Sequence, residues 1–254
     1  MGEYLSLTHV TDRRFYVNPG RAADDGPRDG EHLFGDDYKE KWERQIPAWQ
    51  DAAGRGHEVG NHTVDHICSC NFDFGEVHLE DLALADIART IDEAEQRLDA
   101  LIPAQTGKRS FCYPCYQTFV GVGAEKQSYV PLVAERFLAA RGGGPGNAGE
   151  QGNNAARVDL SEVWGADVAG WNGDQLCAAV DEATEAGRWL VLVFHGVGGE
   201  HGLNVETEDF EQLVSHLASE KESVWTDSFI NVAEEIQAVR VQQASAAAAP
   251  GPKL

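Results

Sequence analysis

The sequence predicts an α/β fold built around a mostly parallel sheet, either open or closed into a barrel. Short apolar runs of strand length alternate along the chain with longer segments whose apolar residues recur at the helical period. One run, residues 189–194, is continuously apolar, as is typical of a strand covered on both faces. The 254 residues, of which 42% are hydrophobic, suffice for one such domain.

Each predicted element has its own signal in the sequence. We expect strands where β-branched and aromatic residues lead into turn residues, at residues 14–18, 57–61, 109–114, 189–194 and 224–225. We expect helices where apolar residues keep a 3.6-residue period, at residues 37–54, 79–101, 130–141, 176–187, 208–218 and 231–241. Glycine-rich and polar segments, residues 21–32 and 141–154, are predicted loops. The domain is expected to span residues 1–242, followed by a flexible tail over residues 243–254.

Charge and hydropathy exclude two classes of partner. The formal net charge is -22, from 42 acidic and 20 basic residues, whereas binding to a phosphate backbone depends on lysine and arginine. No stretch approaches the ~20 apolar residues that cross a bilayer, and the first residues show no basic region ahead of an apolar one. We expect neither nucleic acid nor membrane as a partner. The expected location is the cytoplasm, with an extracellular one as the alternative if a signal peptide precedes this sequence.

The cysteines do not predict a disulfide framework. There are five, an odd and modest number, and we expect reduced thiols. Cys112 and Cys115 form a C-x-x-C pattern, which is also found in redox dithiols and in half of a zinc site. The tyrosine and proline between them, and the lack of a helix signal after them, favour a plain strand end.

The segment GHEVGNHTVDH carries the clearest chemical signal. His62 and His66 are four residues apart and can face the same way, which allows two imidazoles to meet one divalent metal. The spacing alone is also common in surface or capping histidines. His57, inside the predicted strand, is expected to hydrogen-bond locally.

This segment resembles the second motif of the polysaccharide deacetylase (NodB-like) family. The resemblance extends in the right order over residues 14–236: FYVNPG resembles the strand after the family's first motif, FCYPCYQTFVG lies at the third motif, and WLVLVFHGVGG resembles the last. Cys68 and the segment 128–137 match one subgroup of the family. The resemblance implies a (β/α) barrel-like fold and a metal-dependent hydrolase that removes acetyl groups from N-acetylated or O-acetylated carbohydrate.

The resemblance also implies roles for particular residues. His62 and His66 become metal ligands, with zinc as the expected ion and cobalt, nickel or manganese as alternatives. His195 becomes the general acid, and the backbone N–H of Cys115 becomes an oxyanion donor. Cys112 lies where many members have an arginine that orients the catalytic base.

Substrate contacts and thiolate ligands are further expectations. Tyr113 and Trp164 are the expected sugar contacts, and Trp171 is a weaker one, since aromatic faces suit pyranose rings; core packing is the alternative for the two tryptophans. Cys68 and Cys70 lie beside the histidines and are conceivable thiolate ligands, although the resemblance does not require them.

The family's first motif, a strand followed by two aspartates, is the feature we expect to be missing. Only thirteen residues precede Arg14, so the barrel is expected to be incomplete at its N-terminus and the hydrolase to be impaired by the missing motif. Asp24 and Asp25 imitate the motif in a polar loop, and Asp12 is another conceivable substitute. Rival functions are hydrolysis of a non-glycan amide and a non-catalytic remnant that binds a glycan or a partner protein. A homo-oligomer is left open.

Overall fold

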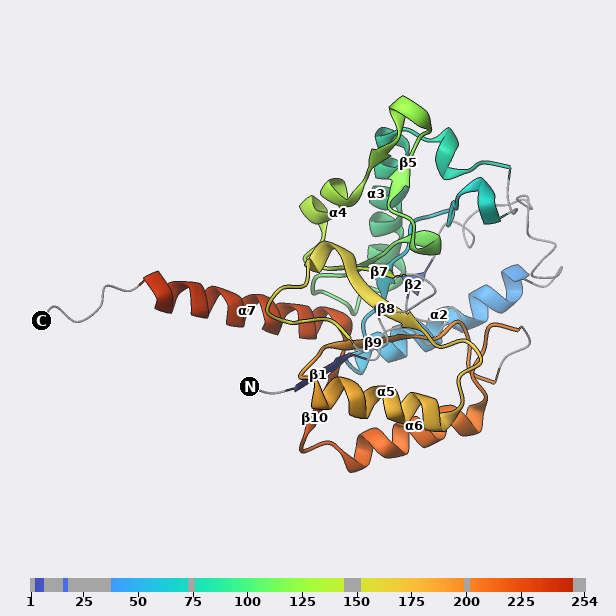
Figure 1. Cartoon of the computed structure of the whole chain (residues 1–254). Helices are drawn as coiled ribbons and strands as arrows, with labels where there is room; N and C mark the ends of the chain where they lie inside the picture. Colours follow the sequence, from blue (N-terminus) through green and yellow to red (C-terminus); the bar gives the residue numbers. More distant parts are fainter. Residues whose placement is uncertain are drawn as a thin grey trace, which may run out of the picture.

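The centre of the fold is a parallel sheet of eight strands (Figure 1). A computed structural model describes residues 3–6, 16–17, 38–72, 76–143, 152–198 and 202–248, with side chains from residue 46 onward. The strands of this sheet are β1 (Glu3–Ser6), β2 (Tyr16–Val17), β3 (Gly60–Asn61), β4 (Phe111–Cys112), β7 (Ala140–Gly143), β8 (Val163–Asp167), β9 (Leu190–Val193) and β10 (Val224–Asp227). Their order is β10-β1-β9-β8-β7-β4-β3-β2, and neighbouring strands are parallel. The predicted α/β class with a parallel sheet is confirmed.

Helices lie on both sides of this sheet in Figure 1. They are α2 (Tyr38–Gly54), α3 (Leu84–Leu101), α4 (Val130–Arg136), α5 (Gly173–Glu185), α6 (Thr207–Ser219) and α7 (Phe229–Ala248). The helices α5 and α6 lie together beside β9 and β10, whereas α3 and α4 lie at the opposite end of the view. A small antiparallel pair, β5 (Phe119–Val120) and β6 (Gln127–Ser128), is separate from this sheet, and β5 lies beside α3 in Figure 1. Among the helices of the described part, none is long and apolar enough to cross a bilayer.

Separate apolar clusters fix the helices to the sheet. The faces of α5 and α6 bury Leu176, Val180 and Leu213 against Leu192 of β9. The helices α3 and α4 pack on β4, where Phe111 is fully buried. The last helix, α7, packs on Trp189 and Val191 and thereby covers the second face of β9. The continuous apolar run of β9 is therefore buried on both faces, as predicted.

The N-terminal strand overturns one expectation. No strand is predicted before Arg14, yet β1 lies between β9 and β10 and is paired with both. Its four residues, EYLS, are too short and too mixed in polarity to stand out in the sequence, and the pairing comes from strands far along the chain. At the other end of the strand order, β2 confirms the strand expected at residues 14–18.

Three boundaries also differ from the prediction. The helix expected over residues 130–141 ends at Arg136, and Ala140 and Arg141 belong to β7, because burial in the sheet overrides the helix preference of alanine. The strand β8 was not predicted, since Trp164 and Gly165 interrupt its apolar pattern. The helix α7 continues to Ala248, so the first residues of the expected tail are helical.

Candidate functional site

The carboxyl ends of four strands bring the candidate site residues to one edge of the sheet. His62 follows β3, Cys112 ends β4, Asp167 ends β8, and His195 comes two residues after β9. Because these strands are parallel, the loops after them leave from the same edge, where α/β proteins commonly bind ligands. The sequence-predicted His62 and His195 are thus placed on the same side of the molecule.

A hydrogen-bonded turn shapes the segment that carries the two histidines. The Asn61 side chain donates to the Ile91 carbonyl of α3 at 3.0 Å and accepts from the Thr63 N–H at 2.8 Å. The Thr63 hydroxyl in turn accepts from the His66 N–H at 3.1 Å. Thr63 and His66 both adopt the left-handed region, with φ of 64° and 51°. Non-glycine residues persist there only when their surroundings hold them, and such strain is concentrated at functional sites.

The imidazoles of His62 and His66 lie side by side. Their ring centroids are 4.6 Å apart and the rings are nearly perpendicular. His62 is buried, and its Nδ1 is 2.8 Å from the carbonyl oxygen of Cys112. In the tautomer that donates this hydrogen bond, Nε2 carries the lone pair, which is the arrangement commonly seen for a metal-binding histidine. Burial lowers the pKa of His62 well below its ordinary value, and the nearby His66 lowers it further.

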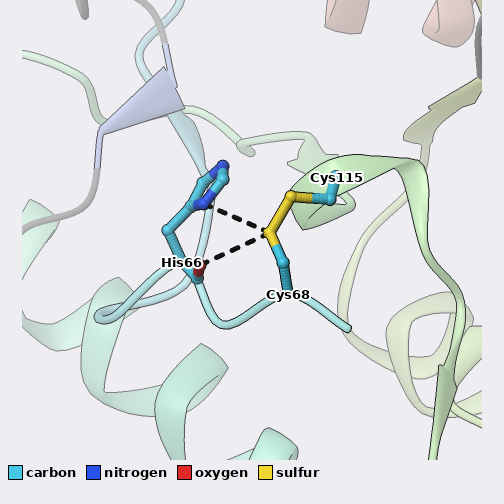
Figure 2. Close-up of side chains that lie close together, drawn as sticks. All are labelled: His66, Cys68 and Cys115. Carbon is cyan, nitrogen blue, oxygen red and sulfur yellow. Dashed lines mark hydrogen bonds between the residues drawn. A yellow bond between two sulfur atoms is a disulfide. The ribbon is translucent and has the colours of Figure 1, made fainter. Parts of the chain in front are cut away.

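A disulfide joins the loop after β3 to the loop after β4 (Figure 2). Cys68 and Cys115 are bonded, with their Cα atoms 5.8 Å apart, so the expectation of reduced thiols is wrong for this pair. Cys112 remains a thiol and does not pair with Cys115, which excludes a C-x-x-C dithiol in this structure. Cys70 is an exposed free thiol. A hydrogen bond of 2.7 Å from the Ser69 N–H to the Gln117 side chain adds a second link between the loops.

The backbone at Cys115 is unusual in a way that the sequence did not reveal. Cys115 lies within the short 3-10 helix η4 (Pro114–Tyr116) but has φ 50° and ψ 25°, and Tyr116 has φ 59°. Within the part of the chain that the structure describes, the Cys115 N–H donates to no acceptor. An N–H in this position is chemically suited to the oxyanion role expected for it.

His195 has a carboxylate partner that sequence reasoning missed. Its Nδ1 is 3.5 Å from Oδ1 of Asp167, which is an ion-pair contact, although the geometry does not make a hydrogen bond. The side chains are 32% and 24% exposed, so the pair lies at the surface of the site rather than in the core. Burial acts to raise the pKa of Asp167, but His195, the Ala169 N–H and Arg141 together bring it below the ordinary value. The position of Asp167 at the end of an unpredicted strand explains why it was overlooked.

Arg141 is a second residue that the sequence did not single out. Its Cα is the register partner of Cys112, and its guanidinium contacts the Cys112 thiol. The side chain is buried, lies over the ring of Tyr116 at 5.1 Å, and its charge acts on both His62 and Asp167. A fixed positive charge thus lies among the candidate residues.

The expected sugar contacts fall in different environments. Tyr113 is fully buried, and its hydroxyl donates to the Ser161 carbonyl at 2.8 Å, which favours a core role. Trp164 is 41% exposed, but as the second residue of β8 it lies toward the amino end of the strand, away from the carboxyl edge that carries the other candidate residues. Trp171 is half-buried and packs against the core beside α5.

Other predicted residues lie away from the site or outside the structure. His57 is exposed and precedes β3 instead of lying within it. Asp12, Asp24 and Asp25 are outside the described residues.

Comparisons of the chain with protein-family models, with curated protein sequences and with solved structures found no match.

Proposed function

We propose that this protein is a metal-dependent hydrolase of the deacetylase type, which removes acetyl groups from N-acetylated or O-acetylated carbohydrate. The proposal includes membership of the polysaccharide deacetylase family and a barrel-like closure of the sheet. It rests on the family resemblance of the segment around His62 and His66, together with the geometry of these two residues.

The observation that carries the proposal is the adjacency of the His62 and His66 rings at the carboxyl edge of the sheet. Two neighbouring imidazoles, one of them oriented through Nδ1 by a backbone carbonyl, form part of a divalent metal shell. When bound, such an ion polarises a carbonyl oxygen and lowers the pKa of a coordinated water. Zinc is the first candidate, and cobalt, nickel or manganese are alternatives.

The other residues of the site supply proton transfer and charge. His195, which lies beside Asp167, is the proposed general acid that protonates the leaving amine or alkoxide. The Cys115 N–H is the proposed donor to the oxyanion. Arg141 is proposed to favour negative charge at the site, because its guanidinium is buried and lies in the low-dielectric interior beside Cys112.

The first test is metal content. Purified protein is expected to bind one divalent ion, and His62→Ala is expected to lose about 10-fold or more in affinity. The matched control is His57→Ala, because His57 is an exposed histidine on the same segment and lies outside the candidate shell. Equal metal content in wild type and His62→Ala would contradict the assignment of the ligands.

The second test is acetate release from a panel of acetylated oligosaccharides and acetylated small amides. Release that depends on the added metal supports the proposed reaction, and the panel separates glycans from other amides. Stoichiometric metal binding with no acetate release from any substrate would leave the ligand assignment standing and would contradict the hydrolase.

A further inference from the structure

We propose that reduction of the Cys68–Cys115 disulfide creates a second metal site, formed by Sγ of Cys68, Sγ of Cys115 and the imidazole of His66. The ligand would be a thiophilic divalent ion such as zinc or cobalt. The site shares His66 with the proposed hydrolytic centre but does not depend on His62 or on any catalytic activity. Reduction would thus offer His66 a different set of partner ligands.

The distances suit a thiolate-rich site. One ligand atom from each side chain, an imidazole nitrogen and the two sulfurs, lies within 4.8 Å of the other two. The Cys68 Sγ is 3.6 Å from Nδ1 of His66. Figure 2 marks this contact with a dashed line. A tetrahedral ion with bonds of about 2.3 Å to sulfur and about 2.0 Å to nitrogen separates such a pair of ligand atoms by about 3.5 Å. The pair is therefore already spaced for a shared ion.

The backbone around the three residues is held independently of the disulfide. The His66 N–H is bound by the Thr63 hydroxyl, the Cys68 carbonyl accepts from the Leu79 N–H at 3.1 Å, and the Ser69 N–H is bound by Gln117. The first two hydrogen bonds fix the loop that carries His66 and Cys68, and the third joins it to the loop of Cys115, so the two loops stay adjacent after the sulfur–sulfur bond is broken. The Cα separation of 5.8 Å then allows both sulfurs to turn toward one ion by rotation about their Cα–Cβ bonds.

The chemistry balances with a thiol reductant. A dithiol such as dithiothreitol gives two electrons and two protons to the Cys68–Cys115 bond and is itself oxidised to a cyclic disulfide. The two protein thiols then lose their protons to solvent as the ion forms two metal–sulfur bonds and one metal–nitrogen bond. Cys115 is only partly buried, which gives the attacking thiolate access to its sulfur.

The test uses cobalt(II), because a cobalt–thiolate bond gives a charge-transfer absorption in the near ultraviolet that histidine and carboxylate ligands do not. The full chain is stripped of metal, reduced with dithiothreitol, separated anaerobically from the reductant and titrated with cobalt(II). A count of free thiols accompanies each titration. The band is expected in the reduced protein, in which two additional thiols are counted, and not in the untreated protein.

Variants assign the band to its ligands. Cys68→Ser and Cys115→Ser should each weaken or shift the band and cost about 10-fold or more in cobalt affinity. His66→Ala should likewise weaken the affinity. Cys70→Ser is the matched control, because Cys70 is an exposed thiol on the same loop and is outside the cluster. His62→Ala should leave the band unchanged, which separates this site from the proposed hydrolytic centre.

Several outcomes would overturn the proposal. In the first, the thiol count rises by two after reduction but the cobalt–thiolate band does not appear. In the second, the disulfide of the folded protein is not reduced by dithiothreitol. In the third, the band persists in Cys68→Ser and in Cys115→Ser. A band in the untreated protein would overturn the dependence on reduction. Far-ultraviolet circular dichroism of every variant ensures that a lost band reflects lost ligands and not lost folding.

Discussion

Cys112 on β4 and Arg141 on β7 are direct neighbours in the sheet, and the Arg141 guanidinium lies against the Cys112 thiol. Burial raises the pKa of Cys112 to about 12, and the positive charge of Arg141 opposes that rise without cancelling it. The thiol therefore stays protonated at neutral pH. The guanidinium contributes a charge to the site, and the neighbouring cysteine is inert.

The cysteines should differ sharply in their reactivity with iodoacetamide. In the folded, unreduced protein at about pH 8, which is near the ordinary thiol pKa, Cys70 should be alkylated first, since it is exposed. Cys177 should react more slowly, because burial raises its pKa. Cys112 should react only after unfolding, and Cys68 and Cys115 only after reduction. Peptide mass spectrometry measures each rate, and labelling of Cys112 as fast as Cys70 would refute its burial.

Gly165 is expected to be required for the placement of Arg141. A Cβ atom at this position would lie 2.6 Å from Cγ2 of Val193 and 3.2 Å from Cδ of Arg141. Gly165→Ala should therefore destabilise the protein by about 1–3 kcal/mol, the usual effect of overpacking. Gly54→Ala is the control, because a Cβ there meets nothing within 4 Å. Denaturant unfolding of the two variants measures their free energies of unfolding. Equal values would show that the residues around Gly165 move to accept a Cβ atom at little cost.

The His195–Asp167 pair should act as one unit in any hydrolysis. If the proposed function is right, His195→Gln should lower kcat by roughly 100-fold. Asp167→Asn should lower it too, and the double variant should be no slower than His195→Gln, because the carboxylate works through the imidazole.

A second histidine–aspartate pair provides the control for that experiment. His216 and Asp181 join α6 to α5, with Nε2 of His216 2.7 Å from the carboxylate. His216→Gln should leave kcat unchanged. A collapse of the melting temperature in His195→Gln, with unchanged specific activity, would instead show that His195 is structural.

The ion pair between Asp92 and Arg136 should make stability depend on pH. Both oxygens of Asp92 accept from the Arg136 guanidinium, at 2.7 and 3.0 Å, and this contact lowers the pKa of the carboxyl. A lowered pKa in the folded state means that the contribution is present above the ordinary pKa of about 3.9 and is lost as the pH falls through the folded value. Because Asp92 is half-exposed, we expect only about 0.5 kcal/mol at neutral pH.

A double-mutant cycle measures this contribution. The coupling between Asp92→Asn and Arg136→Gln should be near 0.5 kcal/mol at about pH 7 and should approach zero at about pH 3. A coupling that is independent of pH would show that the carboxylate charge is not its source.

The sequence was sufficient for the class of fold because the apolar periodicity of the long elements is strong. The helices α2, α3, α5 and α6 and the strand β9 appear close to their predicted places, since each buries a continuous face or run. Short strands are different, because their pairing partners decide whether they form. Thus β1 and β8 were not predicted, and with β8 the role of Asp167 was also missed.

The candidate site was predictable only where one local segment carries it. The spacing of His62 and His66 places their rings together because both belong to one turn. The disulfide between Cys68 and Cys115 joins residues 47 positions apart. The spacing of five cysteines in the sequence does not determine which two of them are bonded. Likewise, Cys112 and Arg141 are neighbours because of the register between β4 and β7. That register depends on how two separate segments align and could not be predicted from either segment alone.

The position of β1 has a consequence for the order in which the molecule assembles. Residues 3–6 pair with residues 224–227, about 220 residues later in the chain. Closing so long a loop is entropically costly and slows folding. During synthesis, β1 cannot form its backbone hydrogen bonds to β9 and β10 until these two strands have left the ribosome. Until then the growing chain exposes an unfinished sheet edge, and this is the interval in which it would be most prone to aggregate or to need a chaperone.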